Sequence, residues 1–365
     1  MAILIAAQTL VSLACAWPPT LTAQDGPAVL RAEPSSAPSL ADLLRPLPYP
    51  ADRLARRRTD VGPAAQALET DHFAVVYTAT DTAVRDLSAR LEAVYRANVR
   101  FGRDLRLPLR SPVHKLDVLV FGTFDQFRAY RTRSQAPEDS LGFFDATEDC
   151  SVFFDLNTYP PIARLRDEID HPASDPSSRR QRLADRLHEN ISALLAQVVQ
   201  HEVAHQLHHH LGVLPFAGDV PDWVAEGLAQ TFELPFVERG ATLELSTNRY
   251  RLFEFTRLYA DRRTWDAALR RLVAADDWRG GKDYALSWAL TDYLYKRHRT
   301  QFASYLRQLA ADDESASTRT ARHRADFERV FGTIDPAFIA GFDEHMQRLR
   351  ARVGAGSPWR APMHP

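Results

Sequence analysis

The sequence predicts an α+β fold, with a small mixed β-sheet layer in the N-terminal half and a mostly α-helical C-terminal half. Short runs rich in aromatic and β-branched residues are concentrated between His72 and Leu156. From Asp175 onward, apolar residues recur at helical spacing over most of the remaining chain. The 365 residues are 45% hydrophobic and 25% charged, which is ordinary globular composition and excludes a disordered or collagen-like chain.

The N-terminus has the pattern of an export signal over residues 1–23. Residues 2–16 carry no charge, and the run is too short for a membrane span of about 20 residues. Small residues follow at suitable cleavage points, so we expect a mature chain that begins near Gln24 and lies in the periplasm or outside the cell. The alternative is a buried N-terminal helix. Cys15 lies in a poor lipoprotein signal, and a lipid anchor there is not favoured.

Residues 24–66 are expected to form a proline-rich linker or an extended strap. Nine of the 23 prolines fall between residues 17 and 63, and proline interrupts regular hydrogen-bonding ladders. The run Arg56–Arg58 is interpreted as a solvated group of charges.

The next part, residues 67–175, is predicted to be an α+β subdomain. Folded structure is expected to begin near Leu68, with strands at 72–77 and 116–121, an amphipathic helix at 81–101 and a short helix at 124–131. Two apolar arms at 141–145 and 150–156 flank a polar turn, which predicts a β-hairpin.

The second half is predicted to be helical. Asp175 and Pro176 suit the start of a long helix that ends at Leu211, where Gly212 suits a left-handed cap. This helix and a shorter one at 221–233 form the predicted segment 176–245. A helical subdomain at 246–350 and a tail at 351–365 follow, and the subdomain has expected helices at 249–261, 264–275, 283–310 and 325–350.

One motif on the long helix points to metal chemistry. His201 and His205 are four residues apart, so both imidazoles lie on one helix face, and Glu202 points close to that face. This is the HExxH arrangement, in which two histidines bind zinc and the glutamate contacts a water. The alternative is a histidine-rich surface helix, because five of the 13 histidines fall within residues 201–210.

A third ligand is needed for a catalytic zinc site. His208 shares the helix face but lies about 10 Å from His201 along the axis, too far for one tetrahedral ion. Glu226 is the better candidate, because a turn after Gly212 can bring a second helix across the first, and Gly227 allows the helices to approach closely. The alternative for Glu226 is an ordinary exposed helix glutamate.

The segments HEVAHQL and PDWVAEGLA resemble the gluzincin-type zinc metallopeptidases of the peptidase MA group. The resemblance is greatest to exported bacterial members with a P-x-W-x-x-E-G-x-A motif, and it covers residues 200–230. It implies that His201, His205 and Glu226 bind one Zn²⁺ per chain and that Glu202 is the general base. It also implies that the mixed sheet packs on the HExxH helix.

The resemblance implies two further parts of the site. Tyr284 corresponds to a tyrosine that stabilises the oxyanion, although by spacing alone it is equally well a core tyrosine. The hairpin near 141–156 would offer an edge strand along which a peptide or protein substrate binds. Thermolysin-like members carry an aspartate where this chain has Gln230. The partners that orient the histidines are therefore not identified, with Asp222 either one of them or a helix cap.

The net charge and the cysteine content exclude several other kinds of partner and site. The net charge of −2 gives no electrostatic reason to expect nucleic acid or an anionic membrane. With Cys15 in the export signal, Cys150 alone remains, which excludes a disulfide framework and a cysteine-based zinc site. No segment of the mature chain reaches the length of a transmembrane span without charge.

The sequence therefore predicts an exported zinc metallopeptidase that hydrolyses peptide bonds. Two alternatives stay open. One is a non-catalytic envelope protein that keeps the same fold, with or without the metal as a structural element, and the other is a zinc hydrolase of a non-peptide amide. A structural zinc site needs no general base, so Glu202 favours an enzyme.

Overall fold

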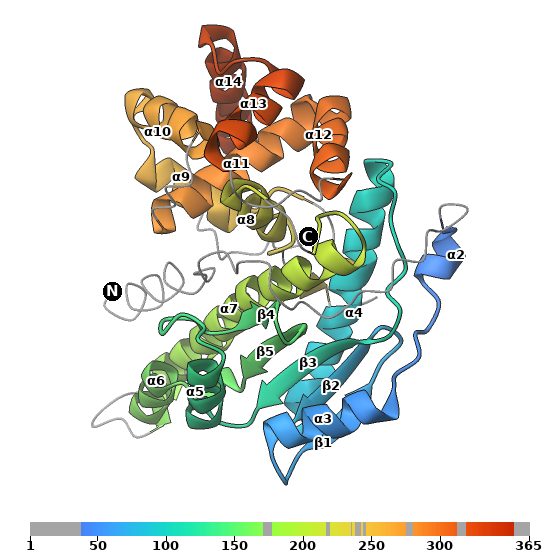
Figure 1. Ribbon diagram of the computed structural model, residues 1–365. Coiled ribbons are helices and arrows are strands. Elements are labelled where there is room, and N and C mark those ends of the chain that lie inside the picture. Colours follow the sequence, from blue (N-terminus) through green and yellow to red (C-terminus); the bar gives the residue numbers. More distant parts are fainter. Residues whose placement is uncertain are drawn as a thin grey trace.

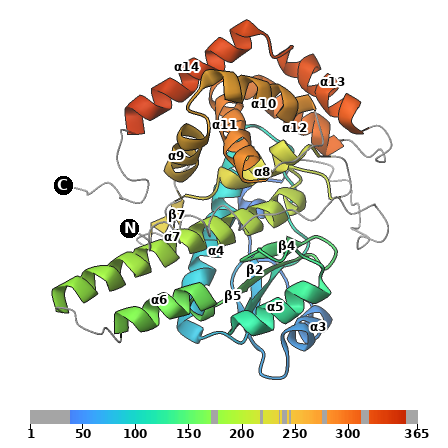
Figure 2. The same cartoon turned by 90° about the vertical axis from the view of Figure 1, so that its left-hand side faces the viewer.

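The protein has two lobes that meet at one long helix (Figures 1 and 2). The computed structural model describes residues 38–170, 177–216, 220–234, 236–237, 242–243, 246–274, 280–311 and 319–353. A sheet lobe is formed by the residues before helix α7 (Ser177–His210), and a helical lobe by those after it. Helix α7 runs between the two lobes, so its side chains can contact both.

The sheet lobe contains one mixed five-stranded sheet, as predicted. Its order is β1-β2-β3-β5-β4, with β2, β3 and β5 parallel and with β1 and β4 antiparallel to their neighbours at the two edges. Strand β1 was not predicted. The strands are Gln66–Glu69 (β1), Phe73–Tyr77 (β2), Leu116–Phe121 (β3), Phe143–Asp145 (β4) and Cys150–Phe154 (β5).

Helices cover both faces of this sheet. Helix α4 (Asp81–Asp104) and α7 lie on one face, and α3 (Ala51–Val61) and α5 (Phe124–Arg133) lie on the other (Figure 2). Every residue of β2, β3 and β5 is consequently buried. Strands buried on both sides read as continuous apolar runs, which explains why the sequence identified them.

The expectation of a linker over 24–66 is wrong for its described part. Helices α2 (Leu40–Leu43) and α3 occupy it, and Pro50 immediately precedes the first turn of α3, where its fixed φ does no harm. Arg57, taken for a solvated charge, is only 1% exposed. Its charge is neutralised because its Nε donates to Asp117 Oδ2 at 2.6 Å.

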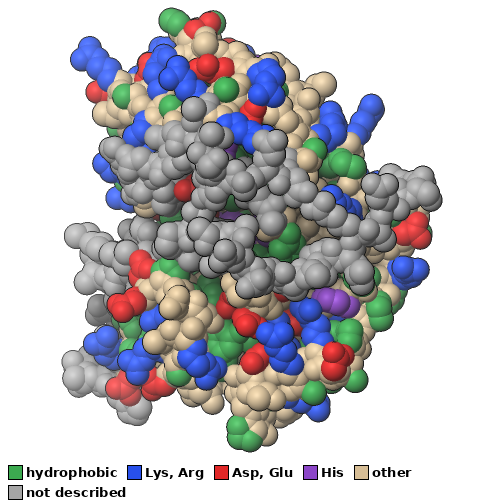
Figure 3. Space-filling view, in the orientation of Figure 1, with side chains coloured by type: hydrophobic (Ala, Val, Ile, Leu, Met, Phe, Trp, Pro, Cys, Tyr) green, Lys and Arg blue, Asp and Glu red, His purple; other side chains and the backbone are tan. Residues whose placement is uncertain are grey.

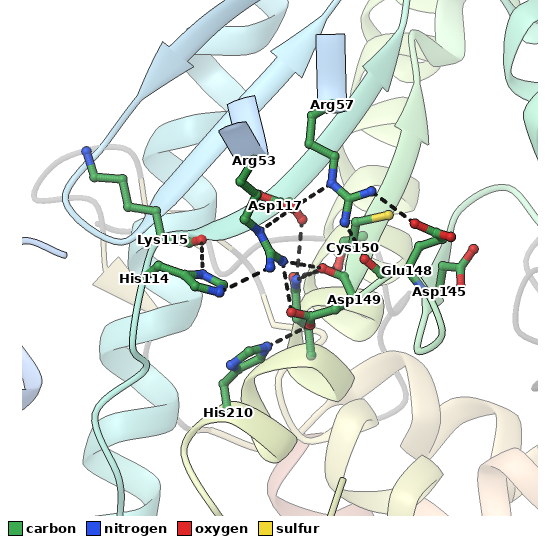
Figure 4. A network of polar contacts seen from close by, with 12 residues as sticks. Arg53, Arg57, His114, Lys115, Asp117, Asp145, Glu148, Asp149, Cys150 and His210 are labelled. Atoms are coloured by element: carbon green, nitrogen blue, oxygen red, sulfur yellow. Dashed lines mark hydrogen bonds and ion pairs between the residues drawn. The ribbon is translucent and has the colours of Figure 1, made fainter. Parts of the chain in front are cut away.

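Helix α3 is joined to the sheet by a buried ionic network (Figure 4). Asp117 at the start of β3 also accepts from Arg53 Nε at 2.8 Å. Arg53 Nη2 reaches Asp149 Oδ2 at 2.9 Å, and His210 Nε2 lies 2.7 Å from Asp149 Oδ1. The network therefore ties α3, the β4–β5 hairpin and the end of α7 together.

Helix α7 ends as the sequence predicts. Its last residue is His210, and Gly212 follows with a left-handed φ of 74°. The predicted start at Asp175 and Pro176 lies outside the described residues. The short helices η1 (Leu156–Thr158) and α6 (Pro160–Asp170) lead into α7 and were not predicted.

The helical lobe contains more elements than expected. A two-stranded ribbon of β6 (Phe236–Val237) and β7 (Thr242–Leu243) was not predicted, and the helices expected at 283–310 and 325–350 are each two helices. The helices are α8 (Asp222–Gln230), α9 (Arg249–Leu258), α10 (Arg262–Ala274), α11 (Gly281–Arg297), α12 (Arg299–Ala311), α13 (Arg319–Phe331) and α14 (Pro336–Val353).

Both breaks have local causes. His298 leaves the helical region at φ −124° and ψ 38°, and its Nδ1 lies 3.0 Å from Gln301 Oε1. Gly332 adopts φ 81° after α13, which ends that helix. Asp335 then accepts from the Phe338 N–H at 2.8 Å and caps α14, whose first residue is a proline.

Gly227 does allow a close helix contact, but the partner is α11 and not α7. A Cβ atom at residue 227 would lie 2.2 Å from Thr291 Oγ1 and 2.6 Å from the Ser287 carbonyl oxygen. One turn before Gly227 on α8, Trp223 stacks on Tyr305 with ring centroids 6.0 Å apart. Helix α8 is thus held within the helical lobe while it contacts α7.

The visible surface carries charges of both signs. Figure 3 shows Lys and Arg side chains interspersed with Asp and Glu side chains over both lobes. Within the described part of the chain, every helix falls short of the length or the apolar character that crossing a bilayer requires.

Candidate metal centre

Two histidines meet in the last third of helix α7. His201 and His205 are 1% and 2% exposed, and their Nε2 atoms are 3.0 Å apart. The four-residue spacing on a regular helix places both rings on one face, as the sequence predicts. Two imidazole nitrogens therefore point into the same small volume between the lobes.

Helix α8 brings a carboxylate to the same point. Glu226 is 2% exposed, with Oε2 at 3.0 Å from His201 Nε2 and Oε1 at 3.6 Å from His205 Nε2. The ligand atoms of His201, His205 and Glu226 all lie within 4.8 Å of one another. The structure thus assembles the three residues that the resemblance implied.

His201 is oriented by a carboxylate that the sequence did not identify. Glu233 Oε1 lies 2.9 Å from His201 Nδ1. Glu233 also accepts from Arg251 Nε at 2.7 Å and from Asn248 Nδ2 at 3.2 Å. Burial opposes ionisation of Glu233, but Arg251 and His201 outweigh it and lower its pKa to about 2. An ionised Glu233 accepts a hydrogen bond from the Nδ1–H of His201, which favours the tautomer whose lone pair is on Nε2.

The surroundings of His205 disfavour its protonation. Burial lowers its pKa well below the ordinary value, and the neighbouring histidines act in the same direction. Two imidazoles and a carboxylate in a buried space form an N₂O donor set, and such a set suits Zn²⁺. The residues present therefore fit a zinc ion, which would satisfy their lone pairs together.

Glu202 lies beside this triad and contacts the sheet. Its Oε2 accepts from the backbone N–H of Phe144 in β4 at 3.0 Å. The side chain is 6% exposed, and burial raises its pKa to about 8. The described geometry places a carboxylate between the histidines and the edge strand of the sheet.

Tyr284 is brought to the same site. It lies in the first turn of α11, and its ring centroid is 6.4 Å from that of His201. The guanidinium of Arg251 also lies over the Tyr284 ring, with Cζ 5.8 Å from the ring centroid. The sequence left open whether Tyr284 is a site residue or a core residue, and the structure shows it to be buried next to a histidine of the triad.

His208 is separate from the triad, as its distance along the helix predicts. Its ring packs 5.6 Å from that of Phe232, and burial lowers its pKa to about 3. Gln230, which replaces the aspartate of thermolysin-like proteins, has no hydrogen-bond partner for its amide atoms among the described residues. Asp222 is half-buried in the first turn of α8.

Glu233 was missed because its position depends on the tertiary fold. It lies beyond the end of α8, where helical spacing no longer applies, and Arg251 from α9 fixes it. The one signal in the sequence was that Glu233 is the first acidic residue after Glu226, which does not by itself show a contact with His201.

Part of the chain matches a known protein family. Residues 195–314 match a family described as a protein of unknown function (DUF1570), which is about a third of the chain. The matched segment contains the triad together with Glu202, Glu233 and Tyr284. No curated protein matches the chain.

Proposed function

We propose that this protein is a zinc-dependent metallopeptidase. The observation that carries the proposal is the buried triad of His201, His205 and Glu226, with the carboxylate of Glu202 next to it. When bound, a zinc ion supplies Lewis acidity, which lowers the pKa of water at the site and polarises a carbonyl. The residues around the triad provide the remaining functions.

Glu202 is the proposed general base. It lies one residue from His201 and is buried, so its carboxylate can take a proton from water and return it to a leaving amine. Tyr284 is the proposed donor to the oxyanion, because its ring packs beside His201. Glu233 keeps the Nδ1 proton of His201 in place and so fixes its tautomer.

The proposed substrate is a peptide or protein segment that lies beside β4. This strand is at the edge of the sheet, and Glu202 contacts its backbone. An extended chain at a sheet edge gains backbone hydrogen bonds, which suits recognition of many sequences. The peptide bond would then lie close to the general base.

Two other functions share the same fold and site. A non-catalytic envelope protein would need the triad at most as a structural element, and a zinc hydrolase of a non-peptide amide would use the same residues on another substrate. The burial of Glu202 next to the triad favours an enzyme over a structural site, because an extra buried carboxylate is costly without a role.

Glu202→Gln tests the proposal, because it preserves the shape of the side chain but removes the base. We expect wild-type protein to bind one zinc and to cleave members of a diverse quenched-fluorescent peptide library. The variant should keep zinc and melting temperature and lose activity by about 10²–10⁴-fold. A wild-type protein that binds zinc but cleaves no peptide would favour the non-catalytic or non-peptide alternatives. Full activity in Glu202→Gln would assign the base to another residue.

We also propose that the protein is exported. The support is the uncharged N-terminal run with small residues before Gln24, which lies outside the described residues. N-terminal sequencing of the native protein should give a start near Gln24. Recovery of an intact Met1 from a cytosolic fraction would contradict export.

A further inference from the structure

The backbone of β4 contacts the proposed general base directly. We propose that the N–H of Phe144 is a positioning group for Glu202 and not a hydrogen-bond donor to a substrate strand. This inference rests on the proposed function of the site. If a substrate simply added as a strand to this edge, every backbone group that points outward would be expected to contact it. One of these groups is instead assigned to the general base.

The strand geometry shows which way this N–H points. Strand β4 pairs with β5 through Phe143 with Val152, Phe144 with Ser151, and Asp145 with Cys150. Antiparallel pairs alternate between residues that exchange hydrogen bonds and residues whose backbone groups point outward. The Phe144 N–H donates to Glu202 Oε2, so it points away from β5 at the edge of the sheet.

This contact divides the work of the Glu202 carboxylate. Oε2 is held by the Phe144 N–H at 3.0 Å, which fixes the rotation of the carboxylate and leaves Oε1 for proton transfer. A backbone donor to a carboxylate is a charge-assisted hydrogen bond, stronger than an ordinary amide contact. The rate of proton transfer depends steeply on geometry, so a carboxylate that is held in place transfers a proton faster than a mobile one.

The strand that supplies the N–H is itself fixed on α7. A Cβ atom at Gly142 would lie 2.6 Å from Val198 Cγ1, which shows that the strand runs directly against the helix one turn before Glu202. At the hairpin turn, Asp149 adopts a left-handed φ of 53° and is held by Arg53 and His210 (Figure 4). The chain is therefore fixed relative to Glu202 both just before β4 and at the hairpin turn that follows it.

For a substrate strand at β4, this donor is already engaged by Glu202. Nearby, the Gly142 carbonyl accepts from Ser140 Oγ, so a second backbone group of the edge is also engaged. If the Phe144 N–H served substrate binding, its removal would weaken binding. If it holds Glu202, its removal would slow the chemical step. These outcomes are separable as changes in KM and in kcat.

Phe144→Pro removes the N–H, and Phe144→Ala is its matched control. Proline is tolerated at an edge strand where the N–H faces away from the neighbouring strand. Both variants lose the ring, which stacks 5.8 Å from His209, so their difference isolates the N–H. On one peptide that wild type cleaves, we expect kcat of Phe144→Pro to fall about 10²-fold below that of Phe144→Ala, with KM and zinc content unchanged. A raised KM with unchanged kcat would overturn the proposal.

Amide hydrogen exchange at Phe144 tests the contact without any activity. In the zinc-free full chain we expect slow exchange in wild type and in Glu202→Gln, whose amide oxygen can still accept, and fast exchange in Glu202→Ala. Unchanged exchange in Glu202→Ala would show that Glu202 does not hold this N–H and would refute the inference even if Phe144→Pro fails to fold. If wild type cleaves no peptide while exchange follows Glu202, the proposed function fails and the contact itself stands.

Discussion

Single residues at the site differ in how far the sequence could locate them. His201 and His205 were predictable because helix geometry alone brings residues four apart together. Glu226 was predictable only as a candidate, since its approach requires a turn and a second helix. Glu233 could not be predicted, because a loop after α8 and an arginine from α9 determine its place.

Glu233 gives the first residue-scale prediction. Glutamine at position 233 is uncharged and can donate or accept, so it holds His201 Nδ1 less strongly and does not select one tautomer of the ring. We therefore expect Glu233→Gln to lower zinc affinity about 10–100-fold in a chelator competition assay. Glu254→Gln is the matched control, because Glu254 also accepts from Arg251, at 2.9 Å, and Glu233 keeps its bond to His201 in that variant. Equal losses in the two variants would mean that the arginine, and not the histidine contact, sets zinc affinity.

At the scale of elements, the apolar pattern of the sequence predicted the buried strands and the long helix. It did not predict the breaks between helices or the short elements. Strands β2, β3 and β5 are buried on both faces, and this leaves continuous apolar runs in the sequence. The break between α13 and α14 had signals in Gly332, Asp335 and Pro336, but the helical periodicity on both sides outweighed them. Helix α3 was missed because its buried face carries Arg57, which is tolerated there because it is paired with Asp117, Asp60 and Glu148.

The ionic network that fixes α3 to the hairpin predicts a pH dependence. Burial raises the pKa of Asp149, but His210 and Arg53 outweigh burial and hold it below the usual 3.8. A carboxylate with a lowered pKa stabilises the fold above its unfolded pKa, and that stabilisation is lost as pH falls through the folded value. The contribution of Asp149 is therefore complete near neutral pH and declines below pH 3.8.

Asp149→Asn isolates this charge, because asparagine also tolerates the positive φ of 53° at this position. We expect urea unfolding at pH 6 to show a loss of about 2–3 kcal/mol relative to wild type, the value of hydrogen bonds to a charged group. The difference should shrink as the pH is lowered below 4. A difference that stays constant down to pH 3 would show that the ionisation of Asp149 does not contribute.

At the scale of the whole molecule, the candidate metal centre joins two lobes. His201 and His205 belong to α7, which packs on the sheet through β4 and β5, whereas Glu226 belongs to α8, which packs on α11 in the helical lobe. An ion that requires all three ligands would bind only when the lobes are in their native relation. Its binding free energy would then stabilise the entire fold and not one element.

Zinc should therefore raise the melting temperature of the full chain in one transition. A ligand that binds only the folded state stabilises it by about 2.7 kcal/mol at a free concentration of 100 times its Kd. We expect this shift in wild type and in Glu202→Gln, because Glu202 is not a ligand, and its loss in His205→Ala and in Glu226→Ala. His208→Ala should keep the shift, since His208 packs on Phe232 outside the triad. A shift that survives in Glu226→Ala but disappears in His208→Ala would place the ion on α7 alone, and the two lobes would then fold without a shared metal.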